Sequence, residues 1–207
     1  GVAAFDSLPF VCYTTVALRS PRGDFGAGGS TGRFKDGGLK GIILSAGQGR
    51  RLLPLTRNLP KCLIRIGGRT VLEWQLRMLA RAGVHHVVVV TGFGAAEVDA
   101  RLPKITPPGM QVRTLYNELY DRADNLVSCA VASPEMQEDF LLLNGDTLAE
   151  DSVVERLLGS PETPVAMAIA EKRTYDADDM KVSRAGTLVT RVGKDLTDDV
   201  SHGEAIG

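Results

Sequence analysis

The chain has 207 residues, enough for one sizeable domain, and its hydrophobic content of 43% supports a buried core. A net charge of −1 and a pI near 6.4 do not indicate a nucleic-acid or anionic-membrane partner. No apolar stretch is long enough for a membrane span, and Cys12, Cys62 and Cys129 lack the spacing of a disulfide framework or zinc site, which fits a cytoplasmic protein.

The N-terminal part differs in composition from the rest of the chain. Residues 20–38 are rich in Gly, Ser and Arg, which predicts a flexible leader over residues 1–38 and one domain over residues 39–207. One short strand or helix is expected within residues 5–18. The first residue is Gly1 and the sequence stops abruptly at Gly207, so we expect a fragment or processed material, truncated at its C-terminal end.

The run from Lys40 to Leu63, KGIILSAGQGRRLLPLTRNLPKCL, carries the strongest signal. Its apolar residues Ile42–Leu44 predict a central parallel strand that is buried on both faces. Because Gly47 and Gly49 remove side-chain bulk from the loop that follows, backbone N–H groups of residues 45–51 can approach phosphate oxygens. The pattern favours a phosphate-binding loop.

Three cations surround this loop. Arg50 and Arg51 can clamp phosphate oxygens in pairs, and Lys61 adds a point charge, which together suit a triphosphate. A dinucleotide fingerprint is disfavoured because Leu52 stands at its third glycine, and the P-loop pattern GxxxxGK[ST] is absent from the sequence. On the glycines alone, an ordinary strand-to-helix turn with surface arginines would be the better interpretation.

The following segments alternate between helix and strand. Helices are expected at residues 70–82, 95–102, 125–132 and 151–158, and strands at residues 86–91, 111–116 and 139–143. Thr70 and Glu73 form a capping box for the first of these helices, and Gly83 terminates it. This rhythm predicts an α/β fold with a doubly wound, mostly parallel sheet that binds ligands at the carboxyl ends of its strands.

The C-terminal quarter has a different pattern. Residues 165–170, 181–183 and 187–192 read as strands, and the last two are joined by a turn at residues 184–186. A small β hairpin or lid beside the main sheet is therefore expected.

The glycine-loop segment resembles the signature LAAGxGTRLxPxTxxxPK of the nucleoside-triphosphate transferase family. The matching residues are Leu44, Ala46, Gly47, Gly49, Arg51, Leu52, Pro54, Thr56, Pro60 and Lys61. Ser45 replaces an alanine. Arg50 replaces a small hydroxyl residue, and this replacement could alter triphosphate contacts or add one. The resemblance implies a Rossmann-like nucleotidyltransferase fold, nucleotide contacts from Leu44 through Arg50 including Ser45 and Gln48, and catalytic roles for Arg51 and Lys61.

A second resemblance lies in YNELYDRADNLVSCAVA. It is similar to the YNxxYxxxNNxxSL stretch of the branch that transfers cytidylyl groups to phosphocholine and similar phosphorylated alcohols. The resemblance implies nucleotide contacts from Asn117, Asp124, Asn125 and Ser128, although Asp124 stands where the pattern has asparagine. From the residues alone, Asp124 or Asn125 could simply cap the next helix.

Asp146 follows the apolar strand FLLL and the pair Asn144-Gly145. Its carboxylate should emerge at the carboxyl edge of the sheet, where it could bind Mg²⁺ or only shape a turn. The family resemblance favours Mg²⁺. It also makes Glu204 the nearest candidate for a second metal ligand, with His202 as the alternative.

Lys181 and Lys194 both have acidic neighbours, so surface ion pairing would explain them. The resemblance instead implies that a lysine of this region reaches an acceptor phosphate or the α-phosphate, and GKDL around Lys194 is typical of the alcohol-phosphate cytidylyltransferase branch. His85 and His86 are expected to be structural, and Cys62 to be a packing residue.

The resulting hypothesis is an Mg²⁺-dependent nucleotidyltransferase that moves CMP from CTP to phosphocholine, an inositol phosphate, a phosphonate or a similar acceptor, releasing pyrophosphate. The alternatives are a sugar-1-phosphate nucleotidyltransferase that uses UTP, dTTP or GTP, and a non-catalytic nucleotide-binding relative. The sequence does not identify the acceptor. It also leaves the oligomeric state open, and a homo-oligomer is possible.

Overall fold

The computed structural model describes residues 15–18, 38–122, 125–159, 165–172 and 174–205. Its main feature is a six-stranded sheet with the strand order β6-β5-β2-β7-β1-β8. The strands are β1 (Thr15–Leu18), β2 (Lys40–Ser45), β5 (His86–Thr91), β6 (Gln111–Tyr116), β7 (Phe140–Asn144) and β8 (Val165–Met167). Strands β6, β5, β2 and β7 run parallel, and β1 is antiparallel to both β7 and β8. The predicted mostly parallel α/β sheet is confirmed.

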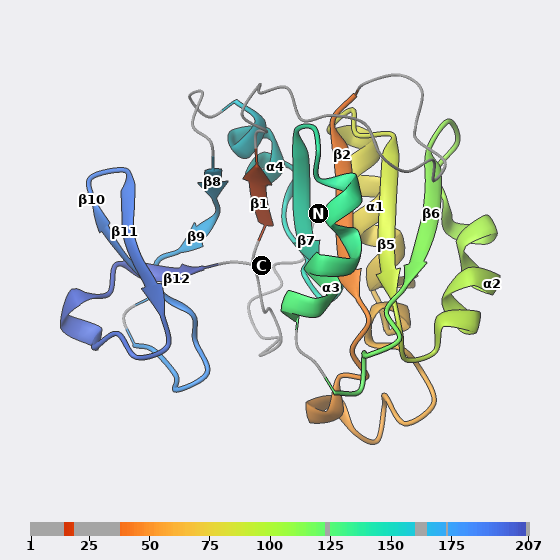
Figure 1. Ribbon diagram of the computed structural model, residues 1–207, viewed down its shortest axis with the longest axis horizontal. Coiled ribbons are helices and arrows are strands. Elements are labelled where there is room, and N and C mark those ends of the chain that lie inside the picture. Colours follow the sequence, from red (N-terminus) through yellow and green to blue (C-terminus); the bar gives the residue numbers. More distant parts are fainter. Residues whose placement is uncertain (1–14, 19–37, 123–124, 160–164, 173, 206–207) are drawn as a thin grey trace.

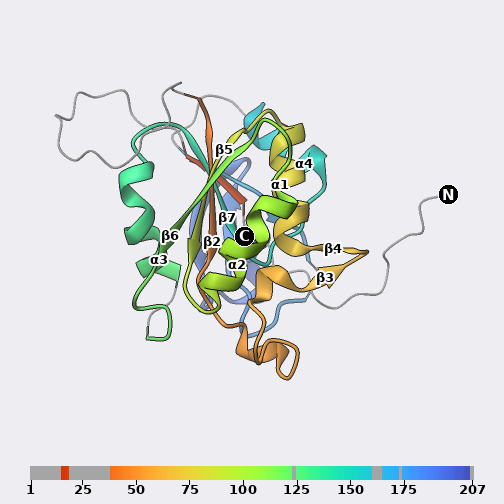
Figure 2. The ribbon, with the colours of Figure 1, turned by 90° about the vertical axis from the view of Figure 1, so that its right-hand side faces the viewer.

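Helices cover both faces of this sheet. α1 (Val71–Arg81), α2 (Ala95–Ile105) and α4 (Asp151–Leu158) lie on one face, and α3 (Asn125–Ala132) lies on the other (Figures 1 and 2). Thr70 accepts a hydrogen bond from the backbone N–H of Glu73, which confirms the expected cap of α1. None of the described helices has the length and apolar character that a membrane crossing needs.

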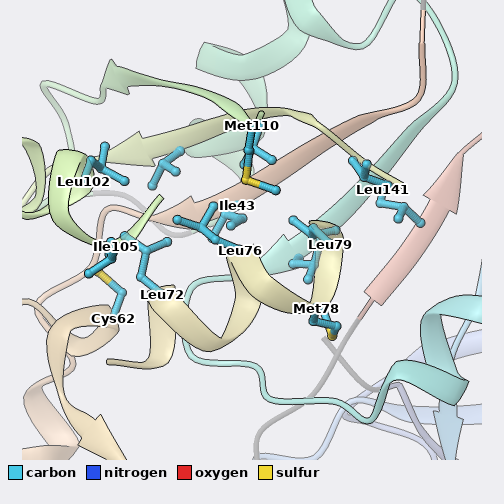
Figure 3. Packing of buried hydrophobic residues seen from close by; sticks show 14 of the residues in the cluster. Ile43, Cys62, Leu72, Leu76, Met78, Leu79, Leu102, Ile105, Met110 and Leu141 are labelled. Carbon is cyan, nitrogen blue, oxygen red and sulfur yellow. The ribbon is translucent and has the colours of Figure 1, made fainter. Parts of the chain in front are cut away.

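The core follows from the side-chain alternation of the strands. Ile43 of β2 and Leu141 of β7 face the helix α1, where they meet Leu72, Leu76 and Leu79 (Figure 3). The intervening residues of the same strands, Ile42, Leu44 and Phe140, pack on the opposite face, which α3 covers. All four valines of the run 87–90 are fully buried. Burial on both faces explains why these strands read as continuous apolar runs.

A smaller, four-stranded antiparallel sheet lies beside the main one, with the order β11-β10-β12-β9 (Figure 1). Its strands are β9 (Ile169–Ala170), β10 (Lys181–Ala185), β11 (Leu188–Gly193) and β12 (Gly203–Ala205). The expected hairpin is therefore confirmed as β10–β11. The remaining elements are the strand pair β3 (Arg65–Ile66) and β4 (Arg69–Thr70), and the 3₁₀ turns η1 (Arg50–Leu52), η2 (Lys61–Leu63), η3 (Ser133–Glu135) and η4 (Asp198–Val200).

Several boundaries differ from the sequence-based expectation. α2 continues to Ile105 because burial of that side chain holds the last turn beyond Pro103. The strand expected over residues 165–170 is broken into β8 and β9, which belong to different sheets. Since β10 extends to Ala185, the hairpin turn lies at residues 186–187, and Gly186 has the positive φ of 62° that the turn requires. Within the expected leader, Thr15–Leu18 forms a strand of the central sheet.

Candidate active site

The glycine loop begins where β2 ends. Gly49 has a φ of 70°, and its carbonyl accepts hydrogen bonds from the Leu52 N–H at 2.9 Å and the Thr56 hydroxyl at 2.8 Å. A Cβ atom at Gly49 would lie 3.1 Å from the Lys61 side chain. Glycine is thus needed both for the left-handed backbone and for the close approach of Lys61.

Lys61 and Asp146 meet at the carboxyl edge of the sheet. The Lys61 ammonium donates to the Asp146 carboxylate in an ion pair, and their side chains are 33% and 20% exposed. The turn that carries Asp146 is attached to β2, because the Gly145 N–H donates to the Leu44 carbonyl at 2.7 Å. A Cβ atom at Gly145 would lie 2.6 Å from the Ser45 side chain. Two segments far apart in the sequence therefore bring opposite charges to the glycine loop.

Arg50 and Arg51 extend into solvent from the same loop. Arg51 Nη1 lies 3.5 Å from a carboxylate oxygen of Asp178, and Lys194 Nζ lies 3.5 Å from the other oxygen. The Arg51 side chain is 81% exposed and that of Asp178 is 65% exposed. Since exposed ion pairs are weak, an anionic ligand could displace Asp178 from both cations.

Asn117 and Ser128 have a structural role that the sequence did not indicate. Both are buried, and the Asn117 amide donates to the Ser128 hydroxyl at 3.1 Å. The Asn117 N–H also donates to the Thr91 carbonyl at 2.8 Å. These bonds join the ends of β5 and β6 to α3, so the two side chains shape the site from behind its surface.

Asn125, by contrast, is exposed at the start of α3. Its amide donates to the Asn144 side-chain oxygen at 2.9 Å, which places it beside the end of β7. Asp124 lies outside the described residues. The predictions that Asn117, Asp124, Asn125 and Ser128 contact nucleotide remain predictions.

Lys181 and Glu204 lie within the small sheet, where each is bonded to its neighbours. The Lys181 ammonium donates to the Leu196 carbonyl at 2.8 Å and lies 3.4 Å from Asp198. Glu204 is buried and lies 2.5 Å from the ammonium of Lys172. Their predicted roles as phosphate contact and second metal ligand stay predictions, and these contacts favour structural roles.

The contacts or burial of three further side chains, His202, Trp74 and Cys62, indicate their roles. His202 accepts a hydrogen bond from the Arg184 N–H at 3.3 Å. The Trp74 ring N–H donates to the Ile66 carbonyl at 2.8 Å, consistent with a packing role. Burial raises the pKa of the Cys62 thiol to about 11, partly offset by a hydrogen bond with Ser45, so this thiol is not poised as a nucleophile.

The donor set at this edge suits a divalent cation only in part. Within the described part of the chain, no three or more His, Cys, Asp or Glu side chains are grouped to hold a metal ion. Mg²⁺, however, commonly binds one or two carboxylates together with substrate phosphates and water. Asp146, partly exposed beside the glycine loop, fits such a shared site.

Two residues tied to the site were missed by sequence reasoning. Asp178 contacts Arg51 and Lys194, and nothing in the run of aspartates around it singles it out. Gln75 donates hydrogen bonds to the turn that carries Asp146. Its signal was a polar residue on the apolar face of a helix, between Leu72 and Leu76.

Comparison with known proteins gives a consistent result. The family model described as "MobA-like NTP transferase domain" matches residues 41–178. CMP-5'-(3-aminopropyl)phosphonate synthase of Streptomyces rubellomurinus is 34% identical over 154 residues, which cover 74% of this chain and 24% of that protein. Choline-phosphate cytidylyltransferase of Streptococcus pneumoniae is 28% identical over 104 residues, covering 50% of this chain and 43% of that protein.

A solved structure supports the fold. The inositol-1-phosphate CTP transferase from T. maritima aligns with a TM-score of 0.66 at 22% identity, covering 84% of this chain and 70% of that one. At this identity the likeness shows the Rossmann-like nucleotidyltransferase fold and nothing finer. The match covers 24% of the length of the phosphonate synthase and 43% of the length of the choline-phosphate cytidylyltransferase. The chain therefore spans less than half the length of either relative.

Proposed function

The chain belongs to the MobA-like NTP transferase domain family, and from this premise we propose that it transfers CMP from CTP to a phosphorylated small alcohol or a phosphonate. Pyrophosphate is the second product. The observation that carries the proposal is the meeting of Lys61 with Asp146 beside the glycine loop. Cation, carboxylate and open backbone at one sheet edge suit the binding of a metal-associated triphosphate.

The reaction needs little from the protein besides positioning and charge. An oxygen of the acceptor's phosphate or phosphonate forms a bond to the α-phosphorus of CTP while the bond from that phosphorus to the bridging oxygen of pyrophosphate breaks. The attacking oxygen is already anionic, so no general base is required. Backbone N–H groups of the glycine loop, Arg51 and Lys61 would bind the triphosphate and stabilise the charge that develops on the leaving pyrophosphate.

Asp146 is the residue that would hold Mg²⁺, together with oxygens of the triphosphate. When bound, the ion would supply neutralisation of phosphate charge. The Lys61 ammonium pairs with Asp146 in this structure, and on nucleotide binding it can reach phosphate instead. Lys194, exposed at the hairpin, is the better placed of the two later lysines to contact an anionic ligand, because Lys181 is largely buried.

Cytidylyl transfer is favoured over other donors by the later of the two sequence resemblances and by the names of the relatives. One relative is named a choline-phosphate cytidylyltransferase, and the other a CMP-5'-(3-aminopropyl)phosphonate synthase. The glycine-loop signature is shared with enzymes that act on sugar 1-phosphates, so a sugar-1-phosphate nucleotidyltransferase that uses UTP, dTTP or GTP is the second candidate.

The test is pyrophosphate release in the presence of Mg²⁺. CTP, UTP, dTTP, ATP and GTP are each offered with a panel of phosphorylated alcohols, phosphonates and sugar 1-phosphates. We expect release that depends on CTP together with one alcohol phosphate or phosphonate. Release only with a sugar 1-phosphate would overturn cytidylyl transfer in favour of the second candidate. Nucleotide binding without release in any combination would instead indicate a non-catalytic relative.

A further inference from the structure

Gln75 occupies a position in α1 where an apolar side chain is expected. It lies three residues after Leu72 and directly before Leu76, on the helix face that packs against the central sheet. Both leucines are fully buried, and Gln75 is only 1% exposed. A long polar side chain therefore enters the core from a helix that the proposed mechanism does not use.

The Gln75 side chain ends at the turn that carries Asp146. Its amide nitrogen donates to the Asn144 carbonyl at 2.7 Å and to the Thr147 carbonyl at 2.9 Å. These two residues flank Gly145 and Asp146 on either side. The Gln75 amide therefore bonds to both ends of one short turn and links this turn to the rigid helix α1.

The side-chain oxygen of Gln75, in contrast to its nitrogen, is not explained by these bonds. Within the part of the chain that the structure describes, its side-chain oxygen is buried without a hydrogen-bond partner. Flipping the amide would place that oxygen against the two carbonyls, so the donors define the orientation. An unsatisfied buried acceptor destabilises a fold, so packing alone gives no reason for glutamine here.

We propose that Gln75 is a positioning residue that holds the turn at residues 144–147, so that the Asp146 carboxylate faces Lys61 and the glycine loop. The turn has a second tie, from the Gly145 N–H to the Leu44 carbonyl. The Thr147 N–H also donates to the Asn144 carbonyl at 3.1 Å and closes the turn itself. Among these bonds, those of Gln75 are the ones that link both ends of the turn to α1. Its effect on the reaction rests on the proposed function, but its effect on the turn does not.

The test compares Gln75→Met and Gln75→Glu with the wild-type protein. Methionine keeps a similar volume and removes both donors, and glutamate adds a carboxylate opposite two carbonyl oxygens. Gln137→Met is the matched control, because the Gln137 amide also donates to a backbone carbonyl, that of Ser133, but Gln137 is exposed and follows the 3₁₀ turn η3. Circular dichroism and thermal unfolding check that each variant folds.

The first readout is amide hydrogen exchange of the unliganded protein. In Gln75→Met we expect the amides of residues 145–148 to exchange at least about tenfold faster, with β2 and β5 unchanged. Wild-type exchange rates at this turn in folded Gln75→Met would overturn the proposal. Because no substrate is involved, this outcome is independent of whether the proposed reaction occurs.

The second readout is kinetic. Loss of a residue that orients a ligand-bearing group typically lowers activity about 10- to 100-fold. We expect Gln75→Met to lower kcat by that factor and to raise the Mg²⁺ concentration for half-maximal rate, with little change in KM for the acceptor. Values within twofold of wild type would contradict the role in catalysis. If Gln75→Glu does not fold, Gln75→Met alone carries both readouts.

Discussion

The edge of the central sheet and the small antiparallel sheet both hold many charged residues, but they use them differently. At the edge, Arg50 and Arg51 extend into solvent. Beside the small sheet, between β9 and β10, Lys172 lies 2.9 Å from Asp179 and 2.5 Å from Glu204 of β12. Burial alone would lower the pKa of Lys172, but hydrogen bonds to Glu204 and Asp179 outweigh this effect and raise it.

The difference teaches that residue type does not by itself define a functional group. The sequence offered both Lys61 and Lys181 as candidates for phosphate contacts. The Lys61 side chain is 33% exposed and lies beside the open glycine loop. The Lys181 side chain is only 11% exposed and donates to the Leu196 carbonyl. Charges of the first region are available to a ligand, and those of the second region stabilise the fold.

Lys61→Ala tests the first half of this comparison and should have the largest effect. Removing a preorganised cation from a phosphate site typically lowers the rate about 100- to 1000-fold. We expect a loss of that size in the rate of pyrophosphate release, with the thermal midpoint nearly unchanged. Lys104→Ala, at an exposed position in α2, is the control and should retain activity. A rate near that of wild type would remove Lys61 from the site.

Lys172→Met tests the second half. It leaves the buried carboxylates of Asp179 and Glu204 without their shared cation. Because Lys172 is about a third exposed, we expect a loss of about 2 kcal/mol in the free energy of unfolding, below the usual cost of breaking a buried ion pair. Urea unfolding measures this change. Lys194→Met, whose partner Asp178 is exposed, should change stability far less, and equal losses in the two variants would contradict the comparison.

Asp179→Asn gives the pH dependence of the same cluster. Burial would raise the pKa of Asp179, but hydrogen bonds from Lys172 and the Asp176 N–H outweigh it, and the pKa lies below its usual 3.8. A lowered pKa stabilises the folded state above the unfolded value and loses this contribution as pH falls through the folded value. The stability difference between wild type and Asp179→Asn should therefore be full near neutral pH, begin to fall near pH 3.8 and vanish only below the lower pKa of the folded state. A pH-independent difference would show that packing, not charge, is responsible.

Asp178→Asn should have the smallest effect on stability, because its partners Arg51 and Lys194 are solvent-exposed. We expect a change of less than about 0.5 kcal/mol in the free energy of unfolding. Pyrophosphate binding to the unliganded protein, measured by calorimetry at low salt, should become slightly tighter, since the carboxylate no longer competes for these cations. Weaker binding would mean that Asp178 arranges the cations for the ligand. Asp195→Ala, which removes an exposed carboxylate that pairs with Arg191, is the control and should leave pyrophosphate binding unchanged.

The sequence predicted the parallel sheet well because its central strands are buried on both faces and Thr70 caps the helix α1. The glycine loop and Asp146 were also placed correctly at one edge, since carboxyl ends of parallel strands share that edge. The sequence did not reveal that Asn117 and Ser128 bond to each other, or that Glu204 pairs with Lys172. Such pairings depend on contacts between distant segments, which a local pattern does not encode.

The position of β1 has a consequence for the order in which the chain can fold. Thr15–Leu18 pairs with β7 on one side and with β8 on the other. A ribosome makes this strand before either partner, so the segment must wait unpaired until residues 140–167 have been synthesised. Pairing across such a long stretch of chain is slow, because the closing of a large loop precedes the contacts that stabilise it. We therefore expect β1 to join the sheet only after the four parallel strands have formed, with β8 pairing on its outer side.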